Sequence, residues 1–173
     1  MAGRLPALPG ETPLISDWAD HLTTLFPEAR VKQFIEMRGA DGGPWRRLCA
    51  LPALWVGLIY DQGALDAAWD IVKGWDAETR QALRVAASEA GLAAEAHGVR
   101  MHDLAREVVA LAQAGLAARA RPGAGGLIPD ETHFLSTLQE SLETGAVPAD
   151  ELLARYQGAW AGDLARVYDE YCY

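Results

Sequence analysis

The sequence predicts an α+β fold in which one strand is followed by a mainly helical subdomain. The segment from Arg30 to Arg38 has strand character, because it contains β-branched and aromatic residues and ends at Gly39. After Pro44, in contrast, the chain has the apolar periodicity of helices almost throughout. We therefore expect one strand and its Gly-rich loop in residues 1–43 and helices in residues 44–173, packed together as a single compact unit.

The first part is expected to hold three pieces in order. Residues 1–15 are rich in Pro and Gly and predict an irregular N-terminal segment. Ser16 or Asp17 can cap a short helix that runs to about Leu25. The strand follows, and the glycines within residues 39–43 then form a loop that could approach a ligand closely.

The second part is expected to consist of consecutive helices. Residues 45–60 are apolar nearly all round, as in a buried helix, and Met101 to Arg119 keep helical spacing of their leucines and valine. The stretch 119–129 is the best candidate for a mobile loop, because it is rich in Pro and Gly. The other helices, most of which begin near an aspartate or proline suited to a first turn, are expected at residues 61–73, 76–90, 130–143, 148–156 and 163–169.

Composition excludes several classes of function. The net charge of −9 argues against binding to nucleic acid or to an anionic membrane. The longest apolar stretch, Leu48 to Tyr60, contains Pro52 and is too short to span a bilayer. Two cysteines cannot form a disulfide framework, and the N-terminus lacks a signal-peptide pattern, so a cytoplasmic location is expected.

The predicted strand carries the main candidate site. Alternate side chains of an extended backbone share a face, so Glu36 and Arg38 should point the same way, while Ile35 and Met37 point into a core. The carboxylate can ligate Mg²⁺ and the guanidinium can hold a phosphoryl oxygen. Spacing alone, however, favours the alternative that the two charged side chains form an exposed ion pair on an edge strand.

The residues around this strand also carry a resemblance. The run FIEMRGADGGPWRRLCALPALWVGLIYD resembles the signature stretch of plant-type glutamate–cysteine ligases, which many proteobacteria share. The similarity extends through GRLPALPGETP and DWADHLTTLFPEARVK upstream and through ETHFL, ELLARY and VYDEYCY downstream. Those enzymes are much longer, and the chain resembles only their C-terminal part. We therefore expect a piece of a longer enzyme, whose missing N-terminal part would be its partner.

The resemblance implies a fold and a reaction. The fold would be the C-terminal part of a glutamine-synthetase-like fold. The complete enzyme would use ATP and Mg²⁺ to join L-glutamate to L-cysteine. The product would be γ-L-glutamyl-L-cysteine, formed through a γ-glutamyl phosphate. This is the first step of glutathione biosynthesis. The chain alone is expected to be inactive, since most of the substrate pocket would lie outside it.

The resemblance also implies roles for individual residues. Strands of the family's curved sheet carry metal-binding carboxylates, and the E-x-R pattern supplies a Mg²⁺ ligand, here Glu36, and a catalytic, phosphate-contacting arginine, here Arg38. Arg46 follows the glycine loop and could contact ATP phosphate, although pairing with acidic neighbours is the alternative.

Cys49 lies in an apolar stretch, so the residues alone predict an inert buried thiol. In the plant enzymes, the cysteine at this place in WRRLCALPA takes part in a regulatory disulfide whose partner lies in the N-terminal part. A second plant cysteine is replaced here by Ala7.

Two other functions stay open. The chain could be a noncatalytic helical interaction module that completes a separately encoded ligase half. Alternatively, it could belong to a related ligase that condenses glutamate with a different amine.

Overall fold

The computed structural model describes residues 4–5, 8–40, 42–121 and 130–171. The chain divides into two compact units, Met1–Asp41 and Gly42–Tyr173. The division lies two residues before the boundary expected from the sequence. The packing of both parts into a single compact unit stays a prediction.

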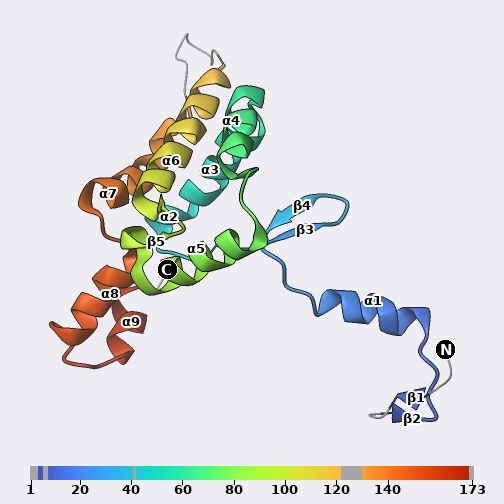
Figure 1. The fold of residues 1–173 in the computed structure, drawn as a ribbon. Helices are drawn as coiled ribbons and strands as arrows, with labels where there is room; N and C mark the ends of the chain where they lie inside the picture. Colours follow the sequence, from blue (N-terminus) through green and yellow to red (C-terminus); the bar gives the residue numbers. More distant parts are fainter. Residues whose placement is uncertain (1–3, 6–7, 41, 122–129, 172–173) are drawn as a thin grey trace. The chain divides into compact units, whose positions relative to one another are not determined.

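Over its described residues, the first unit contains two hairpins and one helix (Figure 1). Strands β1 (Arg4–Leu5) and β2 (Leu8–Pro9) pair antiparallel, in a segment that was expected to be irregular. Helix α1 spans Ile15–Thr23, close to the prediction. Its first turn is held by Asp17, whose carboxylate accepts a hydrogen bond of 2.6 Å from the backbone N–H of Leu14.

The single strand predicted from Arg30 to Arg38 is wrong. The structure has a hairpin there, in which β3 (Ala29–Val31) pairs antiparallel with β4 (Ile35–Met37). The chain reverses at residues 32–34, where the N–H of Lys32 donates to the carbonyl of Phe34 at 2.8 Å. The apolar composition of the segment indicated extended backbone but carried no signal for this reversal.

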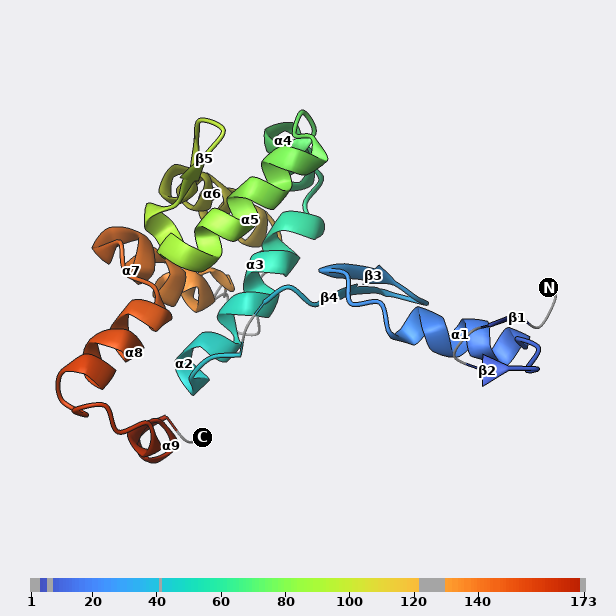
Figure 2. The ribbon, with the colours of Figure 1, turned by 60° about the horizontal axis from the view of Figure 1, so that its bottom comes forward.

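Over its described residues, the second unit consists of helices with one further hairpin (Figure 2). Asp61 and Asp76 accept hydrogen bonds from the backbone N–H groups of Ala64 and Thr79 and cap α4 and α5, as predicted. The helices are α2 (Trp45–Leu48), α3 (Ala50–Ile59), α4 (Gln62–Val72), α5 (Ala77–Ala90), α6 (Met101–Ala118), α7 (Ser136–Thr144), α8 (Pro148–Gln157) and α9 (Ala165–Glu170).

Helix α6 lies at the centre of this unit and packs against α3, α4 and α7. The core contains Ala53 and Leu58 of α3, Ala112 and Leu116 of α6, and Leu135 just before α7. Helices α3 and α6 approach so closely at Gly57 and Gly115 that a Cβ added at either residue would overlap the other helix's backbone. Small residues at the crossing therefore set the distance between the two central helices.

Four expectations for the helical part need correction. The helix predicted over residues 45–60 breaks at Cys49, because a continuous helix would require an N–H that Pro52 lacks. Asp130 precedes a 3₁₀ turn, η2 (Thr132–Leu135), rather than α7 itself. Helix α9 begins two residues later than expected. The hairpin of β5 (Glu95–Ala96) and β6 (Val99–Arg100), which follows a 3₁₀ turn, η1 (Gly91–Ala93), was not predicted.

Helix α3 is also less buried than its composition suggested, since Leu51 and Ile59 are exposed. Over the described residues, no single helix has the length and apolarity needed to cross a membrane. One pair, Trp45–Ile59 with Gln62–Val72, reaches that threshold by length and composition alone, with a bend of 93° between its members. The loop expected at 119–129 lies mostly outside the described residues.

Candidate functional site

The β3–β4 hairpin places two arginine side chains around one carboxylate. The register places Arg30 opposite Glu36, and Arg38 follows β4 directly. Arg30 contacts Glu36 Oε2 through Nε at 2.8 Å and through Nη2 at 2.7 Å. Arg38 Nη1 lies 3.5 Å from the same oxygen. Two guanidinium groups therefore surround a single carboxylate oxygen.

The expectation that Glu36 and Arg38 share a face agrees with this ion pair, because side chains on opposite faces of a strand could not meet. The expectation that Ile35 and Met37, on the other face, point into a core is wrong for Ile35. That side chain is 65% exposed, and Met37 is only partly buried. A hairpin of two three-residue strands has no layer of its own against which to bury an apolar face.

The two arginines keep Glu36 ionised. The hydrogen bond from Arg30 is the largest effect and lowers the pKa of the Glu36 carboxyl below its ordinary value. Desolvation, the next largest, opposes it, and the charges of Arg30, Arg38 and Lys32 lower the pKa further. An ionised carboxylate is the form that ligates a cation. The cluster of three side chains nevertheless carries a net positive charge, which favours an anion beside it.

The local structure orients Arg38. Its backbone N–H donates to the carbonyl of Glu28 at 2.7 Å, so the residue continues the pairing of the hairpin. Its guanidinium lies over the ring of Phe26, with 5.1 Å between Cζ and the ring centroid. The side chain is 25% exposed and is held from two sides. A guanidinium fixed in this way is suited to bidentate contact with a phosphoryl group.

A magnesium ion fits this cluster only in part. The three contacts from Arg30 and Arg38 all go to Oε2 of Glu36, and Oε1 takes part in none of them. That oxygen is a suitable ligand for a hard cation. Within the part of the chain that the structure describes, however, no three His, Cys, Asp or Glu residues come together as a metal site. Glu36 could therefore supply one ligand of a site completed by other residues.

Arg30 is the residue that the sequence analysis missed. It lies six positions before Glu36, beyond the two-residue spacing that identified the E-x-R pair. The sequence carried no signal for the reversal at residues 32–34, which places Arg30 opposite Glu36. Arg30 is a positioning residue here, since its fork holds the carboxylate.

Arg46 and Arg47 belong to the second unit and already have partners. Arg46 Nη1 lies 2.8 Å from the carboxylate of Glu140, with both side chains about half exposed. Arg47 Nη1 donates to Ser141 Oγ at 3.2 Å. Both arginines thus connect α2 to α7, which is the structural alternative considered for Arg46.

Cys49 is exposed, so the expected buried thiol is wrong. The residue lies at the break between α2 and α3. It borders a small cavity of about 200 Å³ together with Pro52, Val56 and Phe134.

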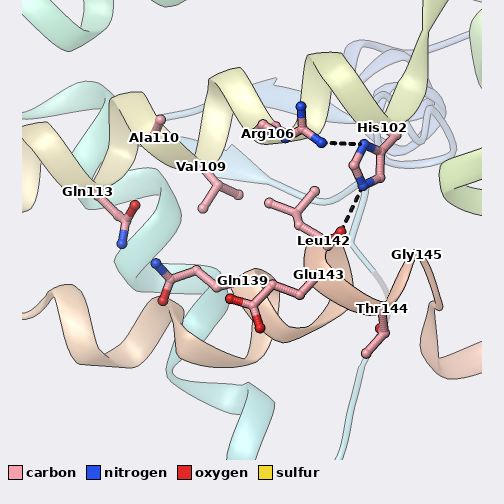
Figure 3. Close-up of a pocket in the computed structure, with 10 residues that line it drawn as sticks. All are labelled: His102, Arg106, Val109, Ala110, Gln113, Gln139, Leu142, Glu143, Thr144 and Gly145. Atoms are coloured by element: carbon pink, nitrogen blue, oxygen red, sulfur yellow. Dashed lines mark hydrogen bonds between the residues drawn. The ribbon is translucent and has the colours of Figure 1, made fainter.

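A groove of about 570 Å³ lies between α6 and α7 (Figure 3). His102 Nε2 donates to the carbonyl of Leu142 at 2.8 Å, because a carbonyl can only accept, and Arg106 Nη2 donates to Nδ1 at 3.2 Å. The figure shows Gln113, Gln139 and Glu143 along the same groove. The bond from His102 to Leu142 joins the two helices, and its bond with Arg106 lies within α6, so both have a structural role and indicate no ligand.

Comparison with known proteins identifies the family. A sequence model of glutamate-cysteine ligase family 2 (GCS2) matches residues 4–170. The chain is 46% identical over 174 aligned residues to the chloroplastic glutamate–cysteine ligase of Solanum lycopersicum. It is 44% identical to that of Arabidopsis thaliana and 42% identical to glutamate–cysteine ligase A, chloroplastic, of Oryza sativa subsp. indica.

These alignments include all of the chain but only part of each relative. The chain spans 32% of the tomato and Arabidopsis proteins and 34% of the rice protein. The resemblance carried by the residues around Glu36 is thereby confirmed over nearly the whole sequence. The chain belongs to glutamate-cysteine ligase family 2.

Proposed function

We propose that the chain forms the C-terminal part of an ATP-dependent glutamate–cysteine ligase with a glutamine-synthetase-like fold. The observation that carries this proposal is the similarity of the entire chain to proteins named glutamate–cysteine ligase. The complete enzyme joins the γ-carboxylate of L-glutamate to the amino group of L-cysteine, and the product γ-L-glutamyl-L-cysteine serves glutathione biosynthesis.

The reaction requires positive charge where two anions meet. The γ-carboxylate of glutamate attacks the γ-phosphorus of ATP, and ADP leaves. The amino group of cysteine then attacks the acyl carbon of γ-glutamyl phosphate, loses a proton and displaces inorganic phosphate. In the first step, a carboxylate approaches a triphosphate, so electrostatic neutralisation is the main demand on the protein.

Arg38 meets this demand by contacting the transferred phosphoryl group. Its guanidinium is already oriented by Phe26 and by the backbone pairing with Glu28, so little side-chain freedom remains to be lost when a phosphate binds. A charged group that is already fixed in place stabilises the transition state more than one that must first reorient during the reaction. Arg30 acts indirectly, by holding Glu36 beside Arg38.

Glu36 would supply one carboxylate ligand to Mg²⁺. When bound, Mg²⁺ neutralises phosphate oxygens and orients the triphosphate. The remaining ligands come from the part of the enzyme outside this chain. The lowered pKa of Glu36 keeps the carboxylate ionised across the physiological pH range, as a metal ligand must be.

Arg46 and Cys49 have more peripheral roles in this proposal. Arg46 is exposed enough to exchange its contact with Glu140 for a phosphate contact. Cys49 is accessible for oxidation, with its partner in the missing N-terminal part. The curated relatives are chloroplastic, so the cytoplasmic location expected for this chain stays a prediction.

The test is the rate of γ-glutamylcysteine formation by the complete ligase that contains this sequence. We expect Arg38→Ala to lower kcat by about 10²–10³-fold, as for the loss of one charge-stabilising donor. Glu36→Gln should weaken the Mg²⁺ dependence of the rate, since the amide is a poor ligand for a hard cation.

The control is Arg84→Ala, which removes an exposed arginine of α5 whose only side-chain partner among the described residues is Gln81. Near-normal turnover of a folded Arg38→Ala enzyme would show that the E-x-R pair is structural. Synthesis of γ-glutamylcysteine by the 173-residue chain alone would refute the expectation that this chain is inactive by itself.

A further inference from the structure

Helix α1 presents an apolar stripe that the described residues of the first unit leave exposed. Ile15, Trp18 and Leu22 follow one another at spacings of three and four, so they share one face of the helix. Their exposed fractions are 85%, 58% and 45%. We call these three residues the α1 stripe. Leu25 and Phe26, which follow the helix, continue the apolar character and are 51% and 75% exposed.

The described side chains of the first unit, within residues 9–40, do not bury the stripe. Among residues 9–40, every side chain is exposed except four that are only half-buried: Arg30, Glu36, Met37 and Arg38. A nine-residue helix is marginal in water by itself, and so is a two-stranded hairpin. The unit therefore needs an apolar partner to keep its helix and hairpin in place.

The charge on α1 excludes an anionic membrane as that partner. The polar residues of the helix include Asp17 and Asp20, and no Lys or Arg occurs between residues 11 and 27. A helix that lies on an anionic bilayer usually carries Lys or Arg along its polar face. The acidic polar face and the aromatic anchor at Trp18 instead suit a protein surface.

We propose that the α1 stripe is the docking surface for the part of the ligase that this chain lacks. The curated relatives are about three times as long as the chain, so some two-thirds of a ligase polypeptide is available to cover the stripe. The inference rests on the proposed function, in that it takes the chain as one part of a longer ligase. Docking through α1 holds the hairpin, and with it Glu36 and Arg38, against the rest of the enzyme.

The first test is co-expression of the tagged chain with the part of the Solanum lycopersicum ligase that the chain does not match. The wild-type chain should co-purify with that polypeptide, and Trp18→Asp should weaken the affinity by about 30-fold or more, as for a central aromatic anchor. Val85→Asp is the matched control, since Val85 is 44% exposed on α5 of the second unit. It should bind like the wild type.

A second measurement does not require the tomato polypeptide to fold by itself. The chain replaces the matching third of the tomato ligase in one continuous chimeric protein, and amide hydrogen exchange is followed over residues 15–26. Exchange should be fast in the 173-residue chain and at least about tenfold slower in the chimera, because docking protects α1.

Several outcomes would overturn the proposal. Equal affinity of the wild-type chain and Trp18→Asp for the tomato polypeptide would overturn it. So would a wild-type chain that does not bind, together with unchanged hydrogen exchange of α1 in the chimera. Slow hydrogen exchange of α1 in the isolated chain would overturn it too. A dimer of the chain that Trp18→Asp abolishes would assign the stripe to a second copy and overturn it as well. A complex that forms but makes no γ-glutamylcysteine would refute the proposed activity and leave the docking surface standing.

Discussion

The close crossing of α3 and α6 makes a sharp prediction for Gly57. A Cβ added there would lie within 3.0 Å of three backbone atoms of Ala112, among them its carbonyl carbon at 2.8 Å. Ordinary contact begins at 3.4 Å, so the carbonyl carbon would have to move away by about 0.6 Å, and the carbonyl oxygen, which lies nearest to the added Cβ, by more than that. Backbone atoms cannot swing aside as a flexible side chain can, so the core around Ala112 would loosen.

The magnitude follows from two opposing effects. Overpacking of a tight core costs about 1–3 kcal/mol, and this contact is at the severe end. Replacing Gly by Ala within a helix, by itself, raises the free energy of unfolding by about 0.5–1 kcal/mol. We therefore expect Gly57→Ala to lower the free energy of unfolding by about 2 kcal/mol, which corresponds to a fall in Tm of roughly 4–8 °C for a chain of this size.

The assay is urea unfolding followed by far-ultraviolet circular dichroism, which reports on the helices. Gly115→Ala should behave like Gly57→Ala, because its Cβ would overlap the carbonyl group of Gly57. Gly74→Ala is the control: it has no atom within 4 Å of an added Cβ and no left-handed φ. It should change stability by less than about 0.5 kcal/mol. A Gly57→Ala variant as stable as the wild type would refute the close crossing.

Three further predictions concern single side chains. The backbone N–H of Thr79, which donates to Asp76 at the start of α5, lowers the pKa of this carboxyl below its ordinary 3.8. The stability from this cap is therefore present above pH 3.8 and is lost as pH falls through the folded-state pKa. The gap in urea midpoint between wild type and Asp76→Asn should shrink in acid, and a gap independent of pH would contradict the assignment. Arg30→Gln should raise the pKa of Glu36 toward 4.5, as followed by carboxyl chemical shifts, because the largest cause of its lowering is removed. Cys49 should react with a thiol reagent in the native chain, as mapped by mass spectrometry, since it is exposed, whereas labelling only after denaturation would place it in a core.

The sequence predicted best what depends on neighbouring residues. The caps at Asp61 and Asp76, the first turn at Pro148 and the long helix α6 all agree with the structure. In each case, the signal is a side chain that bonds or fits a backbone group within one turn. The adjacent placement of Glu36 and Arg38 belongs to the same class, because the pleat of a strand determines which residues share a face.

The family, too, could be read from the residues around Glu36, and comparison with known proteins confirmed it over residues 4–170. What the same residues could not show was the reversal at residues 32–34. Turns of this kind depend on whether two flanking segments find a favourable register, and no Gly or Pro marks the position. The contact of Arg30 with Glu36 was missed for the same reason.

The sequence by itself thus determined the helical character, the caps, the family and the E-x-R pair. Only the tertiary structure decided that Arg30 holds Glu36, that Gly57 and Gly115 set the spacing of α3 and α6, and that Cys49 faces solvent. Local propensity acts over one turn or one strand, whereas register, helix spacing and burial depend on segments remote in the chain. Apolar composition alone cannot tell a side chain in a core from one, such as Trp18, that the structure leaves exposed.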